Sequence, residues 1–171
     1  GMQARRHRPG EAQGVEHLHE VDARGRLGRI GEVDAAGALQ QCLEKRSRVL
    51  LPAFAMGRSQ TLLWYAQKLV VEKKIQPIRV YIDSPMAIDA TALYERFRSE
   101  HRLSEADCRA MSGAAQIVTT PEGSKELDRL SGPAIIISAS GMATGGRVVH
   151  HLKAFLGDAR NLILFGGYQS P

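Results

Sequence analysis

Five short, mostly apolar segments alternate with segments of helical periodicity, and this alternation constrains the fold more than any other feature of the chain. The apolar segments are residues 49–54, 78–82, 116–120, 134–138 and 161–165. Their apolar residues run together rather than recurring at every second position, so both faces of each strand are expected to be buried. Buried parallel strands joined by helices form layered α/β domains. The sequence therefore predicts an α/β three-layer sandwich around a mostly parallel sheet of about five strands.

The segments between these strands carry helical spacing and helical start signals. Ser84-Pro85 and Thr120-Pro121 each place an N-cap side chain before a proline at the first helical position. Three sets of apolar residues recur at helical spacing and predict the buried faces of three helices. The sets are Leu62, Leu63, Ala66, Leu69 and Val70; Met86, Ala90, Leu93, Tyr94 and Phe97; and Val148, Val149, Leu152, Phe155 and Leu156. Further helices are expected near 35–45 and 122–130.

Residues 1–34 differ in composition from the rest of the chain. They contain six arginines and six glycines but no lasting apolar period, so we expect this segment to be poorly ordered or irregular. Residues 35–171 are expected to form one domain. The whole chain has 171 residues, of which 43% are hydrophobic and 24% charged, as is usual for a globular protein. Its formal net charge of +5 is compatible with a nucleic-acid partner but supports one only weakly.

The sequence shows no sign of a membrane or secretory segment. No apolar run approaches the ~18 residues of a membrane span, and the basic N-terminal segment has no apolar core of a signal peptide. The two cysteines, Cys42 and Cys108, lie far apart and outside any C-x-x-C pair. We therefore expect reduced thiols and a cytoplasmic protein without membrane association.

Turns rich in glycine and serine follow most of the expected strands, where ligands bind in open α/β sheets. In the turn SASGMATGGR, the glycines permit positive φ or close approach, and the next helix offers its N-terminus to an anion. Arg147 would add a bidentate oxyanion contact. A tight turn without chemistry is the alternative. The candidate binding residues of this turn are Ser138, Ser140, Gly141, Gly145, Gly146 and Arg147.

Two other strand ends carry candidate substrate-binding residues. Arg58, Ser59 and Gln60 begin a helix directly after the first strand, either as a capped turn or as a contact to RNA or a partner domain. Ser84 follows the second strand at the same edge. Asp83 precedes it, but no second carboxylate is placed beside Asp83, so we assign no catalytic residue.

The histidines give no convincing metal site. Adjacent residues of a helix point about 100° apart, so His150 and His151 are not expected to face one metal and are expected at the surface. The stretch HLHEVD at 17–22 has no predicted scaffold. We therefore predict no metal ligands in this chain.

Four motifs occur in order, each at the end of a strand: PAFAMGRSQ, DSPMA, SASGMATGGRVVHHL and LFGGYQSP. With these motifs, residues 45–171 resemble the β-CASP domain of metallo-β-lactamase-fold RNA-processing nucleases, a family that includes RNase J and the endonuclease of the polyadenylation complex. The resemblance implies a Rossmann-like fold. It also implies a domain that lids the catalytic cleft and helps to bind RNA, with Arg58 and Arg147 pairing with phosphates.

In that family, two zinc ions lie in a separate metallo-β-lactamase domain that carries an H-x-H-x-D-H motif. The motif is absent from this sequence. The resemblance therefore implies that the chain is the β-CASP domain of a zinc-dependent ribonuclease. By itself such a domain is expected to be inactive, and no cofactor is expected in this chain. RNA and the metallo-β-lactamase domain are its expected partners, and a homodimer is possible in this family.

Two other functions stay open at this point. A Rossmann-like domain can bind a nucleotide in the crevice at the strand ends, and such a domain would bind mononucleotides saturably. A domain used only for protein assembly would bind neither a mononucleotide nor RNA. An RNA-binding domain would bind oligonucleotides with an affinity that falls as salt rises.

Overall fold

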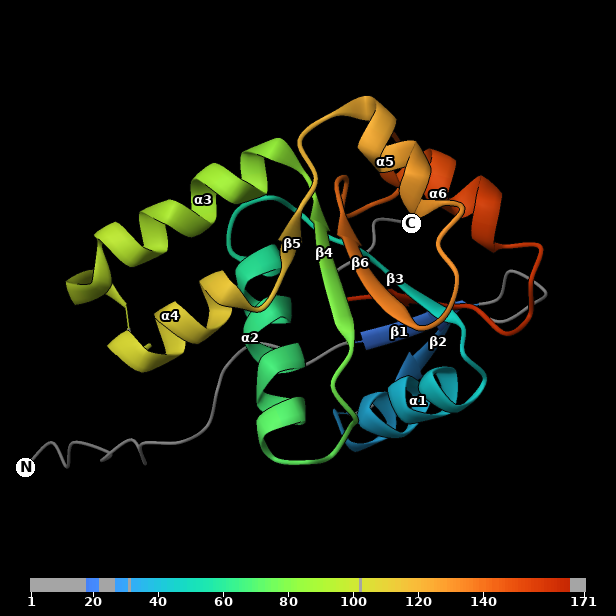
Figure 1. Ribbon diagram of the computed structural model, residues 1–171, viewed down its shortest axis with the longest axis horizontal. Helices are drawn as coiled ribbons and strands as arrows, with labels where there is room; N and C mark the ends of the chain where they lie inside the picture. Colours follow the sequence, from blue (N-terminus) through green and yellow to red (C-terminus); the bar gives the residue numbers. More distant parts are fainter. Residues whose placement is uncertain (1–17, 22–26, 31, 102, 167–171) are drawn as a thin grey trace, which may run out of the picture.

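The computed structural model describes residues 18–21, 27–30, 32–101 and 103–166, and Figure 1 shows a sheet with helices on both faces. Five parallel strands form the centre of the sheet, in the order β7-β3-β6-β4-β5. They are β3 (Arg48–Pro52), β4 (Arg79–Asp83), β5 (Gln116–Ile117), β6 (Ala134–Ser138) and β7 (Leu162–Phe165). The predicted α/β fold is therefore confirmed.

A hairpin from the N-terminal segment extends the sheet beyond β7. Strand β1 (Leu18–Val21) pairs antiparallel with β2 (Leu27–Ile30) and with β7, so that seven strands share one sheet. The expectation that residues 1–34 are irregular is wrong for these two strands. Their sequences, LHEV and LGRI, are too short and too polar to show as apolar runs, and their backbones pair with an existing edge. Residues 1–17, 22–26 and 31 lie outside the described residues.

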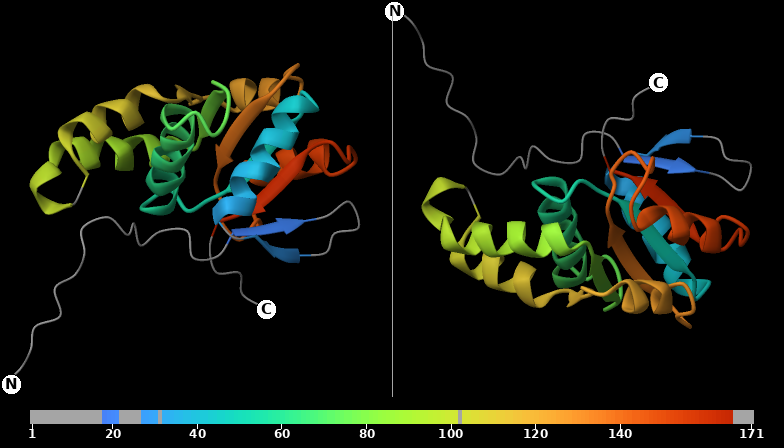
Figure 2. Two further views of the ribbon diagram at one scale, coloured as in Figure 1. Left: turned by 90° about the horizontal axis from the view of Figure 1, so that it is seen from below. Right: turned by 90° about the horizontal axis from the view of Figure 1, so that it is seen from above.

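Helices cover both faces of the sheet. They are α1 (Glu32–Glu44), α2 (Arg58–Val71), α3 (Pro85–Arg96), α4 (Glu105–Gly113), α5 (Pro121–Leu127) and α6 (Val148–Phe155), with the 3-10 helix η1 (Arg98–Glu100) between α3 and α4. Helices α1 and α2 pack on one face, and α5 and α6 on the other. Helices α3 and α4 pack on each other and on α2, and reach past the β5 edge as an arm (Figure 2). Helix α1 begins before the expected boundary at residue 35.

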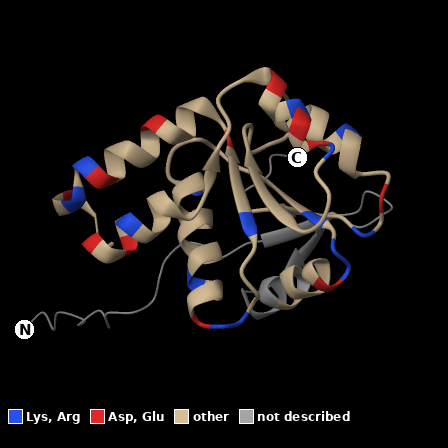
Figure 3. Cartoon of the chain, in the orientation of Figure 1, with Lys and Arg blue, Asp and Glu red and all other residues tan. Residues whose placement is uncertain are grey.

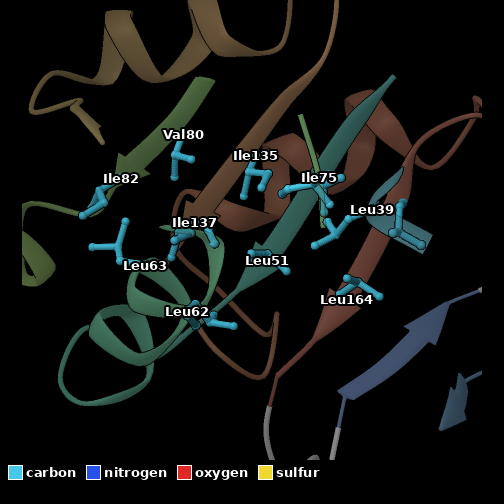
Figure 4. Packing of buried hydrophobic residues seen from close by; sticks show 14 of the residues in the cluster. Leu39, Leu51, Leu62, Leu63, Ile75, Val80, Ile82, Ile135, Ile137 and Leu164 are labelled. Carbon is cyan, nitrogen blue, oxygen red and sulfur yellow. The ribbon is translucent and has the colours of Figure 1, made fainter. Parts of the chain in front are cut away.

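The central strand β6 explains why the strands read as continuous apolar runs. Ile135 and Ile137 pack in the cluster that includes Leu62 and Leu63 of α2 (Figure 4). Ile136, between them, packs in the opposite cluster with residues of α5 and α6. Because each face of the strand meets a helical layer, successive side chains are all buried.

The predicted buried face is confirmed for α2 and wrong for α3. On α2, Leu62, Leu63 and Ala66 are buried as expected. On α3, Ala90 is buried as expected, but Met86 is 70% and Leu93 42% exposed, and Ala87 and Thr91 are buried in their place. The small side chains face α2, where the buried Gln60 Nε2 donates to the carbonyl of Ala87 and to the hydroxyl of Thr91. A polar contact between helices, rather than apolar area, selects this face.

The surface of the described residues is mixed in charge. Along α3, α4 and α5, basic and acidic residues alternate in the cartoon of Figure 3. Exposed ion pairs join Arg98 to Glu105 and Arg160 to Asp158. Within the described ranges, no helix combines the length and apolarity that a membrane crossing requires.

Candidate nucleic-acid interface at the carboxyl edge of the sheet

The neighbouring strands β3 and β6 send their chains to opposite faces of the sheet. Strand β3 continues through residues 53–57, the β3 loop, into α2, whereas β6 continues through residues 139–147, the β6 loop, into α6. The carboxyl edge where such connections diverge is the usual ligand site of open α/β sheets. The turn SASGMATGGR that the sequence singled out lies at this edge.

The two loops are packed against each other with no space to spare. A Cβ atom on Gly141 would lie 2.7 Å from Phe54 Cδ2 and 2.9 Å from the Phe54 nitrogen. Gly146 has φ +75°, and a Cβ there would lie 3.0 Å from the carbonyl oxygen of Ala139. The predicted needs for close approach and positive φ are thus met at Gly141 and Gly146. At Gly145, by contrast, a Cβ atom would have no other atom within 4 Å, so there is room for a side chain.

Four of the candidate binding residues use their side chains inside the domain. Ser59 Oγ donates to the Phe54 carbonyl at 2.9 Å, and Gln60 Nε2 donates to the Ala55 carbonyl at 3.1 Å. Ser84 Oγ caps α3 by accepting from the Ala87 amide at 3.3 Å, and Ser138 Oγ donates to the Asp83 carbonyl at 3.4 Å. All four residues are buried. The structure corrects the direct-contact prediction for these side chains: they build the loops, as the capped-turn alternative for Ser59 and Gln60 proposed.

Besides Arg147, four candidates remain at least partly exposed at this edge: Arg58, Ser140, Gly145 and Gly146. Arg58 opens α2 next to Gly57, which adopts φ +79°. The Ser140 carbonyl accepts from the Ala143 amide at 3.1 Å and shapes the β6 loop. Contact of these residues with RNA stays a prediction.

Arg147 is engaged within the domain rather than directed outward. Its Nη1 donates to Asp83 Oδ1 at 2.7 Å and to the Val118 carbonyl at 3.0 Å, and its Nη2 donates to the Thr119 carbonyl at 2.6 Å. The guanidinium therefore ties the end of the β6 loop to β4 and to the loop after β5. Three of the five N–H donors of Arg147 are thus used inside the domain. Pairing of Arg147 with an RNA phosphate stays a prediction.

Asp83 is the centre of this arrangement. It is fully buried at the end of β4, where His151 Nε2 lies 2.8 Å from Oδ2, and Ser124 Oγ also donates to Oδ2. Burial raises the pKa of Asp83, but hydrogen bonds from His151, Ser124 and Arg147 together outweigh burial and hold the pKa below its usual value. Asp83 is therefore an ionised, structural carboxylate.

The histidine pair differs from the expectation of two surface residues. His151 is fully buried, and the His150 side chain is 31% exposed. Both rings meet one carboxylate: Asp128 Oδ1 lies 2.6 Å from His151 Nδ1, and Asp128 Oδ2 lies 2.8 Å from His150 Nδ1. Although the two residues diverge on α6, Asp128 at the end of α5 lies across both, and the ring centroids are 4.1 Å apart. The apolar stripe of α6 is thus interrupted by a buried polar side chain.

Asp83, His150 and His151 each offer a ligand atom within 4.8 Å of the others, the arrangement among the described residues that comes nearest to a metal site. Its atoms lie at hydrogen-bond separations instead: 2.8 Å from Asp83 to His151, and 2.9 Å from the intervening Ser124 Oγ to His150 Nε2. Arg147 also neutralises Asp83 directly. This group does not fit a metal ion. His17 and Asp22 of the HLHEVD stretch lie outside the described residues.

Sequence reasoning missed Ser124 and Asp128 and gave Asp83 no partner. Ser124 and Asp128 lie one helical turn apart, so they face the same side of α5. The spacing of Ser124 and Asp128, together with the adjacent histidines, was the only sequence signal for this group. The spacing alone does not show which other element the side chains of Ser124 and Asp128 contact.

Comparisons with known proteins agree with this architecture. The family model described as the Beta-Casp domain matches residues 59–171. The chain is 34% identical over 138 residues to "Ribonuclease TTHA0252" of Thermus thermophilus, covering 77% of this chain and 31% of that protein. It is 32% identical to "Transcription termination factor FttA" of a Lokiarchaeum, covering 77% and 21%. It is 28% identical to "RNase J-like protein" of Methanocaldococcus jannaschii, covering 77% and 31%.

The chain thus spans about a third or less of the length of these relatives. The matched region begins at Ser59, the second residue of α2, and includes both the β6 loop and the Asp83 cluster. The motifs that suggested the resemblance therefore lie inside the matched region, except for the residues before Ser59. This chain belongs to the Beta-Casp domain family.

Proposed function

We propose that this chain acts as the β-CASP domain of a zinc-dependent RNA-processing nuclease, where it binds RNA and lids the catalytic cleft and is inactive by itself. The observation that carries the proposal is the β6 loop. Its glycines bring it against the β3 loop at the sheet's switch point, and its outer residues Met142, Thr144 and Gly146 are exposed. Backbone donors in such a loop suit phosphates, which position a nucleic acid without reading its sequence.

The same edge carries apolar side chains that suit a partner domain. Phe54 is 51%, Met56 67% and Met86 70% exposed, and all three follow the carboxyl ends of β3 or β4. Exposed apolar side chains gathered at one edge are typical of an interaction surface. A metallo-β-lactamase domain seated there would close the RNA-holding loops over its reaction centre.

The zinc of the complete enzyme would be held by that partner domain. The residues of this chain do not fit it, because the Asp83 group is satisfied by protons and by Arg147. When bound in the partner, zinc supplies activated hydroxide for phosphodiester hydrolysis. The part of this chain is to hold and orient the RNA backbone.

A charge placed on the β6 loop tests RNA binding. In Gly145→Asp, the new side chain has room, and its carboxylate should repel phosphates. We expect the affinity for a single-stranded RNA oligonucleotide to fall roughly fivefold at low salt, and the loss to shrink as salt rises. Gly145→Ala controls for the side chain, and Gly157→Asp, equally open but beyond α6, controls for net charge.

An equal loss in Gly157→Asp would mean that overall charge, not the β6 loop, binds RNA. A second candidate function is binding of a mononucleotide at the carboxyl edge of the sheet, which the divergence of β3 and β6 favours. Saturable, salt-insensitive binding of a mononucleotide without oligonucleotide binding would select that function.

Location and assembly complete the proposal. We propose a cytoplasmic location because the sequence has only two cysteines, Cys42 and Cys108, and both are buried. Burial raises the pKa of the Cys108 thiol and so keeps it protonated. Whether two copies associate is a matter for light scattering, in which a homodimer would show twice the mass of the chain.

A further inference from the structure

The buried charges behind the β6 loop have no part in the function proposed above. We propose that His151 is a positioning residue, held as an imidazolium between Asp83 and Asp128, and that this buried cation fixes the shape of the β6 loop. The inference concerns the loop itself and holds whether or not the loop binds RNA.

The hydrogen-bond geometry assigns two protons to His151. Its Nε2 lies 2.8 Å from Asp83 Oδ2, and its Nδ1 lies 2.6 Å from Asp128 Oδ1. An ionised carboxylate only accepts hydrogen bonds, and a neutral imidazole has one donor. A neutral His151 would therefore aim a lone pair at one carboxylate inside the protein. With both nitrogens protonated, both contacts are charge-assisted hydrogen bonds.

The surrounding carboxylates pair with this proton. Asp83 from β4 and Asp128 from the end of α5 both face the ring of His151, and Asp83 also meets Arg147 at the end of the β6 loop. Buried charges are tolerated when they are paired and hydrogen-bonded in this way. On the far side, the ring of His151 stacks on Phe155, over which Arg48 of β3 lies.

His150 joins the same hydrogen-bond network from its partly exposed edge. Its Nδ1 faces Asp128, and its Nε2 faces Ser124 Oγ. Because the Ser124 hydroxyl donates to Asp83, its oxygen is left to accept from His150. His150 is partly exposed and can exchange its proton with solvent, whereas His151 is enclosed.

The same carboxylate connects this network to the loop. Arg147 and His151 lie one helical turn apart and take the two oxygens of Asp83, Oδ1 and Oδ2. Arg147 ends the β6 loop, and the next amide, of Val148, donates to the Ala139 carbonyl at 2.8 Å and closes the loop. Loss of the imidazolium would leave Asp83 with one cation and release the start of α6.

Nitrogen-15 NMR of the histidine rings in the full chain tests the protonation state directly. We expect both nitrogens of His151 to carry protons, since each faces a carboxylate oxygen. His101 is the internal control, because its Nε2 lies 2.7 Å from the Tyr94 carbonyl, while its Nδ1 accepts from the Leu103 amide at 3.3 Å, a pattern that needs one proton. A singly protonated His151, or tight binding of added Zn²⁺ with loss of its ring protons, would overturn the proposal.

Amide hydrogen exchange tests the effect on the loop. In Asp128→Asn, the side-chain oxygen can accept a hydrogen bond from one histidine, but the NH2 group faces the N–H of the other histidine and cannot accept from it. We expect exchange of the Ala143, Val148 and Val149 amides to rise roughly tenfold, as for loss of a hydrogen bond to a charged group. Asp128→Glu should restore protection in part, and Asp158→Asn, at a remote exposed ion pair, should not change it. Unchanged exchange in folded Asp128→Asn would refute the positioning role.

Discussion

At the scale of single residues, the turn SASGMATGGR separates into positions that the backbone requires and positions that are open to change. Gly141 and Gly146 are required, the first by contact with Phe54 and the second by a positive φ. Sequence reasoning anticipated such needs because glycine meets them at the lowest steric cost. It did not anticipate that Arg147 would bind Asp83, since those residues lie 64 positions apart.

Gly146→Val should destabilise the domain by about 1–3 kcal/mol, because a β-branched residue is strained at φ +75° and its Cβ would crowd the Ala139 carbonyl. Gly145→Ala, where nothing lies within 4 Å, should change the free energy of unfolding by less than about 0.5 kcal/mol. Urea denaturation measures both. Equal effects would mean that the loop adjusts to either side chain.

Arg147→Ala should also destabilise the domain, by about 1–3 kcal/mol, because it removes a cation from a fully buried carboxylate. Arg160→Ala, at a surface ion pair with Asp158, should lower the free energy of unfolding far less than Arg147→Ala does. Urea denaturation measures both variants. An Arg147→Ala variant as stable as wild type would mean that Arg147 does not support the fold.

The pH dependence of stability should report on Asp83. Its pKa in the folded protein is lowered from 3.8, so its ionised form stabilises the fold above that pH, and this contribution is lost as pH falls through the lower, folded value. Near neutral pH, Asp83→Asn should be less stable than wild type by about 2–4 kcal/mol. The difference should narrow only below about pH 4. A difference that narrows between pH 5 and 7 would contradict the assignment.

At the scale of elements, sequence patterns located strands better than helix faces. Strands such as β6 are buried on both sides, so their apolar runs are conspicuous. The face of α3 was wrong because Gln60 bonds to Ala87 and Thr91, a contact that hydrophobic spacing cannot show. Helix α4 was missed, although Ser104 and Asp107 form a capping box at its start. It has few apolar residues, and only Cys108 and Met111 are buried.

Two leucines test which helix faces are buried. Leu63→Ala on α2 should cost about 2–5 kcal/mol, because Leu63 is fully buried in the core. Leu93→Ala on α3 should cost less than about 1 kcal/mol, because Leu93 is 42% exposed. Thermal or urea unfolding distinguishes the two. A large loss in Leu93→Ala would restore the face that spacing predicted.

At the scale of the whole molecule, the location of the site was predictable but its chemistry was not. Ligand sites of α/β sheets lie at the carboxyl edge, and the glycine-rich turn marked the loop that lies there. The Asp83 cluster draws on β4, α5 and α6, and no local pattern shows that these three elements meet. The buried His151 looked like a polar residue on an outer face because its acceptors are far away in sequence.

The purified chain should not cleave RNA, with or without added zinc, and metal analysis should find no tightly bound zinc. The reason is chemical: the group with the closest approach of ligand atoms among the described residues is already neutralised by Arg147. Incubation with labelled RNA, in the presence and absence of a chelator, measures this. Chelator-sensitive cleavage by the chain alone would show that it holds a reaction centre.

The hairpin of β1 and β2 has a consequence for solubility. Strand β7, with the sequence LILF, pairs with β3 on one side and β1 on the other, so the hairpin covers an apolar strand that would otherwise be an open edge. Uncovered edges of this kind recruit further strands and promote aggregation. A version trimmed at residue 35, where composition changes, would lose this cover. The arginine-rich, glycine-rich segment therefore contains a protective cap against self-association, and the domain is best produced with it.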